Sequence, residues 1–378
     1  MIADKMKKIL LITWIGGGNF GTCLQSYALN AKLKQLGYHV SFVQDIPIRF
    51  KSYIRLVFGF GLKVAKKIIG KFYKTTNESN SLQGAKRRKF QQGNYNVLRI
   101  NTASKLNEVV KNTDCFITGS DQIWNTYVDF NPRFFLDFAE NKKRVAYASS
   151  IGTDDVKEEY KEVVKQHLLK FDHIGVREEA AVKALSKLTG RNDIVQVLDP
   201  TFLLTPTDWR EMSKNAEIEI KIPQKYILCY LIGANSWYTE QLAVVKEKTN
   251  IDNIVIIPSA ENPSFAFENA IVYKNASPVE FIHLLQNATF VCTDSFHASA
   301  LSINNSKNFV EFMRFKDDDI KSQNSRIYDL LEHYGLTERI YDKGSDSWTE
   351  NIDYERVQTI LDDDRKRSLD YLVDAIEN

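Results

Sequence analysis

The sequence predicts an α/β protein with two domains, each built on a parallel sheet, that face each other across a cleft. Three observations support this prediction. Two segments share the order strand, glycine-containing turn, helix and strand, which opens a doubly wound sheet. Short apolar runs with strand character continue after each segment. The chain has 378 residues, and single hydrophobic cores rarely grow beyond roughly 250–300 residues.

The first of these segments begins at residue 8. An apolar strand at 8–12 leads into a glycine-rich turn, and a helical pattern follows to Leu36. The glycines of the turn are Gly16, Gly17, Gly18 and Gly21. Further strands are expected at 39–44, 115–118, 145–148 and 173–176, so residues 1–205 form a Rossmann-like domain. Backbone amides of the turn can approach a phosphate or carboxylate, although tight packing alone also explains such a turn.

The second domain repeats this plan from residue 226. A strand reaches Gly233, a helix follows, and another strand lies at 254–257. Further strands are expected at 270–273, 290–293 and 308–311. We assign residues 206–350 to this second Rossmann-like domain, and two such domains around a cleft form a GT-B-like fold. Residues 351–378 show helical spacing and predict a C-terminal helix that could cross back to the first domain.

Composition and the N-terminal residues favour a cytoplasmic protein. The apolar run at 9–12 is too short for the core of a signal peptide and reads better as a first strand. The four cysteines are scattered without C-x-x-C spacing, so neither a zinc site nor a disulfide framework is expected. They are Cys23, Cys115, Cys229 and Cys292. A reducing compartment fits this pattern best.

Residues 47–93 form a basic, apolar insertion in the first domain. Between Arg49 and Lys89 there are twelve Lys or Arg residues and one acid, so this stretch carries +11 and the rest of the chain −9, for a net charge of +2. Apolar residues in 54–72 can share one helical face, with the lysines mostly outside it. The pattern fits a helix on an anionic membrane surface and a core helix with a solvated basic face equally well. No nucleic-acid fold signature accompanies the charge.

A titratable side chain follows one strand of the second domain. The apolar run from Phe290 stops at Thr293 and Asp294, and His297 comes three residues later, before small residues that start a helix. Because the carboxyl ends of strands open into the ligand crevice of α/β folds, His297 is expected to face the cleft. Its role there would be general acid/base catalysis. The alternative is a histidine satisfied by backbone groups at the helix N-terminus.

Polar residues also follow the strand at 115–118 in the first domain. They are Ser120, Asp121, Gln122 and Asn125, and they flank Trp124. Short hydrogen-bonding groups beside an aromatic ring are what a sugar-binding site needs. We therefore expect the acceptor side of the cleft here and the donor side in the second domain. The alternative is that Asp121 caps the next helix and Trp124 packs in the core.

Six segments in a fixed order resemble a known family. They are Asn19–Gly21 with the following helix, Gly119–Asn125, Tyr147–Gly152, Val176–Glu178, Val197–Thr201 and Thr293–His297. Over most of its length the chain resembles the polysaccharide pyruvyl transferases. The resemblance implies a GT-B-like fold and transfer of a pyruvate unit from phosphoenolpyruvate to a sugar diol, which forms a cyclic ketal and releases phosphate. It implies no cofactor and no metal.

The resemblance also implies roles for individual residues. His297, with Asp294, takes the catalytic position, Arg177 is the candidate donor clamp, and Asn19 joins the acceptor side. Where the family commonly has an arginine two residues before the histidine, this chain has Ser295. Arg314 or Arg326 could supply the missing charge, and Arg326 is favoured. For Arg177, the alternative role is a salt bridge with Glu178 or Glu179.

The function expected from these features is a pyruvyl transferase acting on a surface-polysaccharide precursor. The acceptor is expected to be a lipid-linked glycan, docked through the basic insertion at the inner face of the membrane. Two alternatives remain open: a GT-B glycosyltransferase that uses a nucleotide sugar, and a non-catalytic relative of the fold. The acidic residues 317–319 lack the spacing of a calcium loop, so no metal site is expected.

Overall fold

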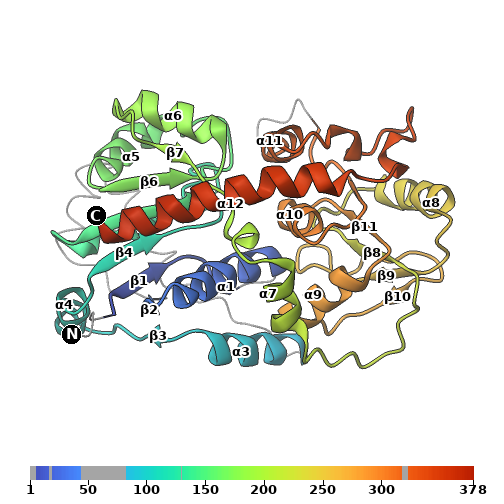
Figure 1. Cartoon of the computed structure of the whole chain (residues 1–378), viewed down its shortest axis with the longest axis horizontal. Helices are drawn as coiled ribbons and strands as arrows, with labels where there is room; N and C mark the ends of the chain where they lie inside the picture. The colour runs from blue at the N-terminus through green and yellow to red at the C-terminus, as the bar shows by residue number, and fades with distance from the viewer. Residues whose placement is uncertain (1–5, 17–18, 44–81, 129, 317–321) are drawn as a thin grey trace.

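The structure is a computed structural model that describes residues 6–16, 19–43, 82–128, 130–316 and 322–378. It contains two parallel β-sheets side by side, with helices on their faces, and one long C-terminal helix that runs across both (Figure 1). This arrangement confirms the predicted class of two Rossmann-like domains.

The first sheet has seven strands in the order β3-β2-β1-β4-β5-β6-β7. Its strands are β1 (Lys8–Ile12), β2 (His39–Val43), β3 (Val97–Leu98), β4 (Cys115–Thr118), β5 (Lys143–Ser149), β6 (His173–Val176) and β7 (Val195–Gln196). Its helices are α1 (Phe20–Gln35), α3 (Leu82–Asn94), α4 (Ala103–Lys111), α5 (Lys161–Leu168) and α6 (Glu179–Thr189). The strand order changes direction between β1 and β4, which is where open α/β sheets form their ligand crevice.

The second sheet has five strands in the order β10-β9-β8-β11-β12. They are β8 (Ile227–Tyr230), β9 (Ile254–Ile256), β10 (Ile271–Val272), β11 (Phe290–Thr293) and β12 (Phe309–Glu311). The helices are α7 (Pro206–Ser213), α8 (Tyr238–Thr249), α9 (Pro278–Asn287), α10 (Phe296–Asn304), α11 (Ser325–His333) and α12 (Tyr354–Glu377). Short 3-10 helices lie at Pro132–Phe135, Asp137–Ala139, Glu158–Tyr160, Pro200–Phe202, Thr337–Arg339 and Ser347–Thr349. In this sheet the strand order reverses between β8 and β11. His297 follows shortly after the end of β11.

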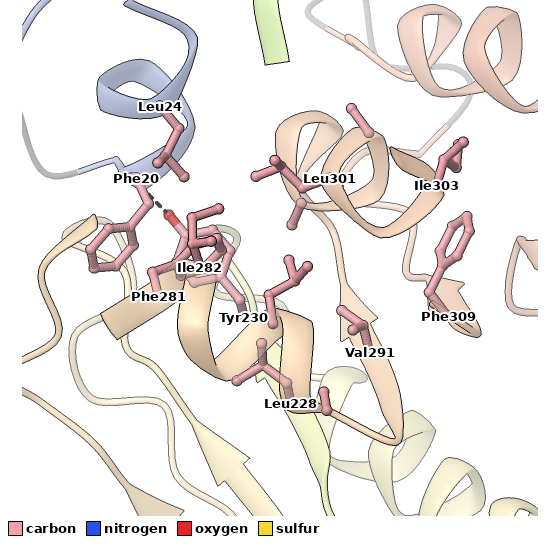
Figure 2. Packing of buried hydrophobic residues seen from close by; sticks show 14 of the residues in the cluster. Phe20, Leu24, Leu228, Tyr230, Phe281, Ile282, Val291, Leu301, Ile303 and Phe309 are labelled. Carbon is pink, nitrogen blue, oxygen red and sulfur yellow. Dashed lines mark hydrogen bonds between the residues drawn. The ribbon is translucent and has the colours of Figure 1, made fainter. Parts of the chain in front are cut away.

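The first turn of α1 packs into the core of the second sheet (Figure 2). The Phe20 ring stacks on Phe281 of α9, with 4.8 Å between ring centroids, and the Phe20 amide donates to the Tyr230 hydroxyl at 3.4 Å. Leu24, one turn later, belongs to the same buried cluster. Leu29 and Leu33, further along the same helix, belong to a separate buried cluster of the first sheet, so α1 contributes to the cores of both sheets.

Two further elements link the sheets. Helix α12 begins beside α10 and ends beside the first sheet (Figure 1), where the Tyr371 hydroxyl donates to the Ala146 carbonyl at 2.9 Å. Lys86 of α3 makes ion pairs of 2.7 and 3.2 Å with Glu219 and Glu280 of the other half. Helix α3 is the described end of the predicted insertion, and its cation Lys86 thus serves contacts within the protein.

The rest of the insertion, with its predicted amphipathic helix, lies outside the described residues, as does the acidic stretch 317–319. None of the helices in the described part of the chain combines the length and the apolar character needed to cross a membrane.

A histidine–carboxylate pair joins α11 to α12 and predicts a pH dependence of stability. His333 Nε2 lies 2.5 Å from Asp364 Oδ2, and this hydrogen bond raises the pKa of His333 above 6.5 against the opposing effect of burial. Since the folded pKa is the higher one, this stabilisation is complete below pH 6.5 and is lost as pH rises through the folded pKa. His333→Asn should lower the free energy of urea unfolding more at about pH 6 than at about pH 9. An equal loss at both pH values would contradict the pairing.

Candidate functional site

Asp199 lies at the centre of a buried polar cluster between the two sheets. It follows β7 and its Oδ2 accepts from Arg177 Nη1 (3.0 Å) and from Ser120 Oγ (3.2 Å), while His297 Nε2 lies 3.5 Å away. The Thr201 amide and hydroxyl donate to Oδ1 at 2.9 and 2.8 Å. Burial acts to raise the pKa of Asp199, but His297 and Arg177 outweigh it and hold that pKa well below its usual range. Asp199 is therefore a fixed negative charge facing the imidazole.

His297 is the second residue of α10 and is held between the two halves of the molecule. Its side chain is 7 % exposed, and its Nε2 has no hydrogen-bond partner among the described residues. On the opposite side of the ring, Nδ1 faces the backbone of Gly21, where an added Cβ would lie 2.3 Å away. An imidazole with an unpaired nitrogen beside a carboxylate is suited to hold or transfer a proton.

Arg177 follows β6 and is fully engaged on one side. Its Nε donates to Glu178 Oε1 at 2.8 Å, and its Nη1 donates to Asp199. The guanidinium carbon lies 4.2 Å from the centre of the Phe296 ring. Its Nη2 is buried and has no partner among the described residues. Arg177 therefore forms the salt bridge with Glu178 that was the alternative to a ligand-binding role. Its Nη2 could still donate a hydrogen bond to a ligand.

Arg326, on α11, is a buried cation without a carboxylate partner in the described residues. Its Nη2 donates to Gln323 Oε1 at 2.7 Å. With the Gln122 amide oxygen turned toward it, that oxygen accepts from Nη1 and Nη2 at 2.9 and 3.1 Å. Burial, with the nearby charge of Arg177, lowers the pKa of Arg326 to about 9. The Arg326 guanidinium is a buried cation whose hydrogen-bond partners are neutral amides, so an anionic ligand beside it would stabilise its charge.

Asp294 and Arg314, predicted as catalytic and donor-binding residues, instead hold loops together. The backbone amides of Ile232 and Gly233 donate to Asp294 at 2.6 and 2.7 Å. The Tyr238 hydroxyl and Arg314 Nε donate to the same carboxylate at 2.8 and 3.2 Å. Both oxygens are thus occupied by structural donors. This corrects the expectation for Asp294, which has a positioning role at the end of β11.

Ser295 is the N-cap residue of α10. Its carbonyl accepts from the Ser299 amide at 2.9 Å, and its own amide donates to Thr293 Oγ1 at 3.1 Å. The residue at the position of the family arginine therefore starts the helix that carries His297, and it contributes no charge.

Trp124, predicted to stack on a sugar, is a core residue. It is 2 % exposed, its ring stacks on Phe135 with 5.4 Å between centroids, and its Nε1 donates to the Phe134 carbonyl at 3.1 Å. Asn125 Oδ1 accepts from the Tyr127 amide at 3.0 Å and so stabilises the following turn. The acceptor role expected for Trp124 is corrected because no face of its ring is available.

Of the remaining predicted acceptor residues, Ser120, Asp121 and Gln122 lie near Arg177 or Arg326, and Asn19 lies at the start of α1. Ser120 donates to Asp199, and Gln122 contacts Arg326 as described above. Asp121 Oδ2 accepts from Thr22 Oγ1 at 2.9 Å. Asn19 caps α1 by accepting from the Gly21 amide at 2.8 Å. The residues predicted for two separate sides of the cleft therefore converge on one site.

Asp199 and Phe296 belong to this cluster although neither was predicted as a site residue. Asp199 lies in the segment 197–201 and follows a strand, so the strand-end rule that selected His297 also applies to it. Phe296 carries no chemical signal in the sequence, because its role depends on the two guanidinium groups that lie 4.2 and 5.8 Å from its ring.

Because Gly21 lies against His297, we expect the substitution Gly21→Ala to lower turnover strongly. In Gly21→Ala the new Cβ would displace the imidazole, and a shift of ~1 Å at a catalytic group can cost about 10²-fold in rate. We expect turnover to fall by that order with donor affinity little changed. Gly93→Ala on α3 is the matched control, since a Cβ there meets nothing within 4 Å. Wild-type turnover in Gly21→Ala would show that the ring position is not critical.

The fold and the buried cluster define an α/β protein with a ligand site between two parallel-sheet domains. The chain belongs to the polysaccharide pyruvyl transferase family, whose model matches residues 19–313. Membership makes the protein a transferase of polysaccharide biosynthesis. No curated protein matches the chain.

The chain is also similar to several solved structures. A putative UDP-N-acetylglucosamine 2-epimerase from Listeria monocytogenes has a TM-score of 0.47 and 13% identity, covering 94% of this chain and 95% of that one. A UDP-N-acetylglucosamine 2-epimerase from Neisseria meningitidis has a TM-score of 0.47 and 10% identity, with coverage of 97% and 100%. The glycosyltransferase SnogD from Streptomyces nogalater has a TM-score of 0.42 and 12% identity, with coverage of 99% and 96%. Similarity at this level carries no information about function.

Proposed function

We propose that this protein transfers a pyruvate unit from phosphoenolpyruvate to two hydroxyls of a sugar in a surface-polysaccharide precursor. The observation that carries the proposal is the pair Arg177 and Arg326 on the Phe296 ring, next to His297. Arg177 Nη2 and Arg326 Nε are buried without partners among the described residues. A donor with a carboxylate and a phosphate would satisfy both cations. Arg326 then supplies the charge that Ser295 lacks.

The two sugar hydroxyls together lose two protons, of which one is balanced by the proton added to C3 and the other leaves with the released phosphate. The first sugar hydroxyl adds across the double bond of the donor: its oxygen bonds to C2, and a proton is added to C3. The second hydroxyl then displaces phosphate from C2 and loses its proton, which completes the cyclic ketal. His297 is the group for these proton transfers, and the fixed charge of Asp199 stabilises its protonated form.

The proposal is tested by measuring what the protein binds and what it releases. Calorimetric titration with phosphoenolpyruvate should show binding that weakens at least about tenfold in Arg326→Met, since a lost charged contact is worth about 1.5–3 kcal/mol. Incubation with phosphoenolpyruvate and a set of nitrophenyl hexosides should release phosphate. A protein that binds UDP-sugars and does not bind phosphoenolpyruvate would favour the glycosyltransferase alternative. Binding of neither would favour a non-catalytic relative.

We also propose that the basic insertion attaches the protein to an anionic membrane surface, where a lipid-linked acceptor would lie. The proposal rests on the charge of +11 between Arg49 and Lys89, because cations near such a surface contribute roughly 1 kcal/mol each. The protein should sediment with anionic vesicles and not with neutral ones, and less so as salt rises.

Charge reversal within the insertion provides the control for this prediction. Changing Lys63, Lys66, Lys67 and Lys71 to Glu should abolish sedimentation with anionic vesicles. The same change at four exposed lysines elsewhere, Lys111, Lys183, Lys187 and Lys221, should leave it in place. Equal sedimentation with neutral vesicles would instead favour a core helix with a solvated basic face.

A further inference from the structure

A half-enclosed cavity of about 280 Å³ lies where the end of the first sheet meets α10, α11 and α12. Arg177 and Glu178 line it from the first half, and Phe296, Arg326, Asp329 and Tyr334 line it from the second. The cavity therefore begins at the arginine pair of the site and extends away from it along α11. Its volume is at the small end of ligand pockets, which span roughly 300–1,000 Å³.

The cavity wall carries buried polar atoms that have no hydrogen-bond partner among the described residues. Two are donors, Arg177 Nη2 and Arg326 Nε, and two are acceptors, Glu178 Oε2 and Asp329 Oδ2. Buried polar groups in folded proteins are almost always paired, so such a concentration indicates a place where a ligand supplies the partners. The donors suit the anionic groups of phosphoenolpyruvate.

The two acceptors call for a different ligand group. The Glu178 carboxylate shares its other oxygen with Arg177 Nε and Ser150 Oγ, both at 2.8 Å, so Oε2 is held in place. Asp329 makes no ion pair within the described residues. Carboxylate oxygens repel the carboxylate and phosphate of the donor and accept hydrogen bonds from neutral hydroxyls. Phe296 and Tyr334 contribute apolar surface to the same wall of the cavity.

We propose that the Glu178–Asp329 side of this cavity is the acceptor subsite, where both carboxylates accept hydrogen bonds from adjacent hydroxyls of one terminal, uncharged sugar ring. This inference rests on the proposed function and specifies its second substrate. The small volume admits one ring, so the remainder of the glycan lies outside the cavity. A neutral ring next to the arginine pair would place its hydroxyls beside the carbon that they attack.

The test separates sugar binding from donor binding. Asp329→Asn keeps the shape of the side chain and removes one accepting oxygen. Its affinity for the best of a set of nitrophenyl hexosides, measured by saturation-transfer NMR and as KM, should fall about 10- to 100-fold, the value of a hydrogen bond to a charged group. The calorimetric affinity of this variant for phosphoenolpyruvate should stay within about twofold of the wild-type value. In the proposed site that ligand is bound by the guanidinium groups and not by Asp329. Glu332→Gln, exposed on the same helix, is the matched control and should change neither.

Each outcome decides one claim. Unchanged sugar affinity in Asp329→Asn, or no sugar bound by the wild-type protein, overturns the acceptor subsite. A fall in phosphoenolpyruvate affinity without a fall in sugar affinity also overturns it and assigns the whole cavity to the donor. Sugar binding that depends on Asp329 in a protein that does not bind phosphoenolpyruvate supports the subsite and refutes the proposed pyruvyl transfer.

Discussion

His297→Ala should abolish pyruvyl transfer and leave the fold intact. The imidazole is titratable, and its buried Nε2 faces Asp199 at 3.5 Å without a hydrogen bond to any described residue. General acid/base catalysis contributes about 10²–10⁴-fold, so turnover should fall by at least that factor. The measurement is phosphate release from phosphoenolpyruvate in the presence of a sugar acceptor.

Two controls separate loss of chemistry from loss of structure. Calorimetric affinity for phosphoenolpyruvate should be retained in His297→Ala, because the proposed donor site consists of Arg177 and Arg326. His283→Ala on α9, away from the cluster, should turn over like the wild type. A His297→Ala protein with near wild-type turnover would remove this residue from the mechanism.

Arg326→Met and Arg177→Met should both impair donor binding, but only Arg177→Met should lower the free energy of unfolding. Arg177 is paired with Asp199 and Glu178, so its removal leaves two buried carboxylates without their cation, which typically costs about 3–5 kcal/mol. Arg326 has no carboxylate within ion-pair distance among the described residues, and its buried charge is destabilised. Replacing it by an apolar side chain should leave the free energy of unfolding unchanged or raise it.

Urea unfolding at neutral pH and calorimetry with phosphoenolpyruvate measure the two effects separately. The expected pattern is a weak donor affinity in both variants and a lowered unfolding free energy in Arg177→Met alone. A strongly destabilised Arg326→Met would show that this guanidinium is a structural group. Unchanged donor affinity in both variants would place the donor clamp elsewhere.

The fold could be predicted largely because its central strands are continuous apolar runs that end at a polar residue. The strands at Cys115–Thr118 and Phe290–Thr293 have the predicted bounds. The edge strands β3 and β7 contain two residues each and were not predicted. Such short pairings are set by the neighbouring strand and leave no periodic pattern in the sequence.

The candidate site was predictable residue by residue, and its assembly was not. The strand-end rule identified His297 and Asp121 in different domains. Whether they meet depends on how α1 docks on the second sheet, which no local pattern encodes. The same limit explains why the predicted roles of Asp294 and Trp124 were wrong. The Asp294 carboxylate accepts hydrogen bonds from amides of a distant loop, and the Trp124 ring is covered by Phe135.

The packing of Phe20 into the core of the second sheet opposes any movement that separates the two sheets. A hinge motion that separated the two sheets would pull Phe20 away from Phe281 and Tyr230 and expose apolar surface to water, at about 25 cal/mol for each Å². Gly21, the next residue, lies against the His297 imidazole, so the same motion would also move Gly21 away from this ring. Folding itself thus sets the positions of Gly21, Asp199 and His297, and ligands would bind between two sheets that are already in contact.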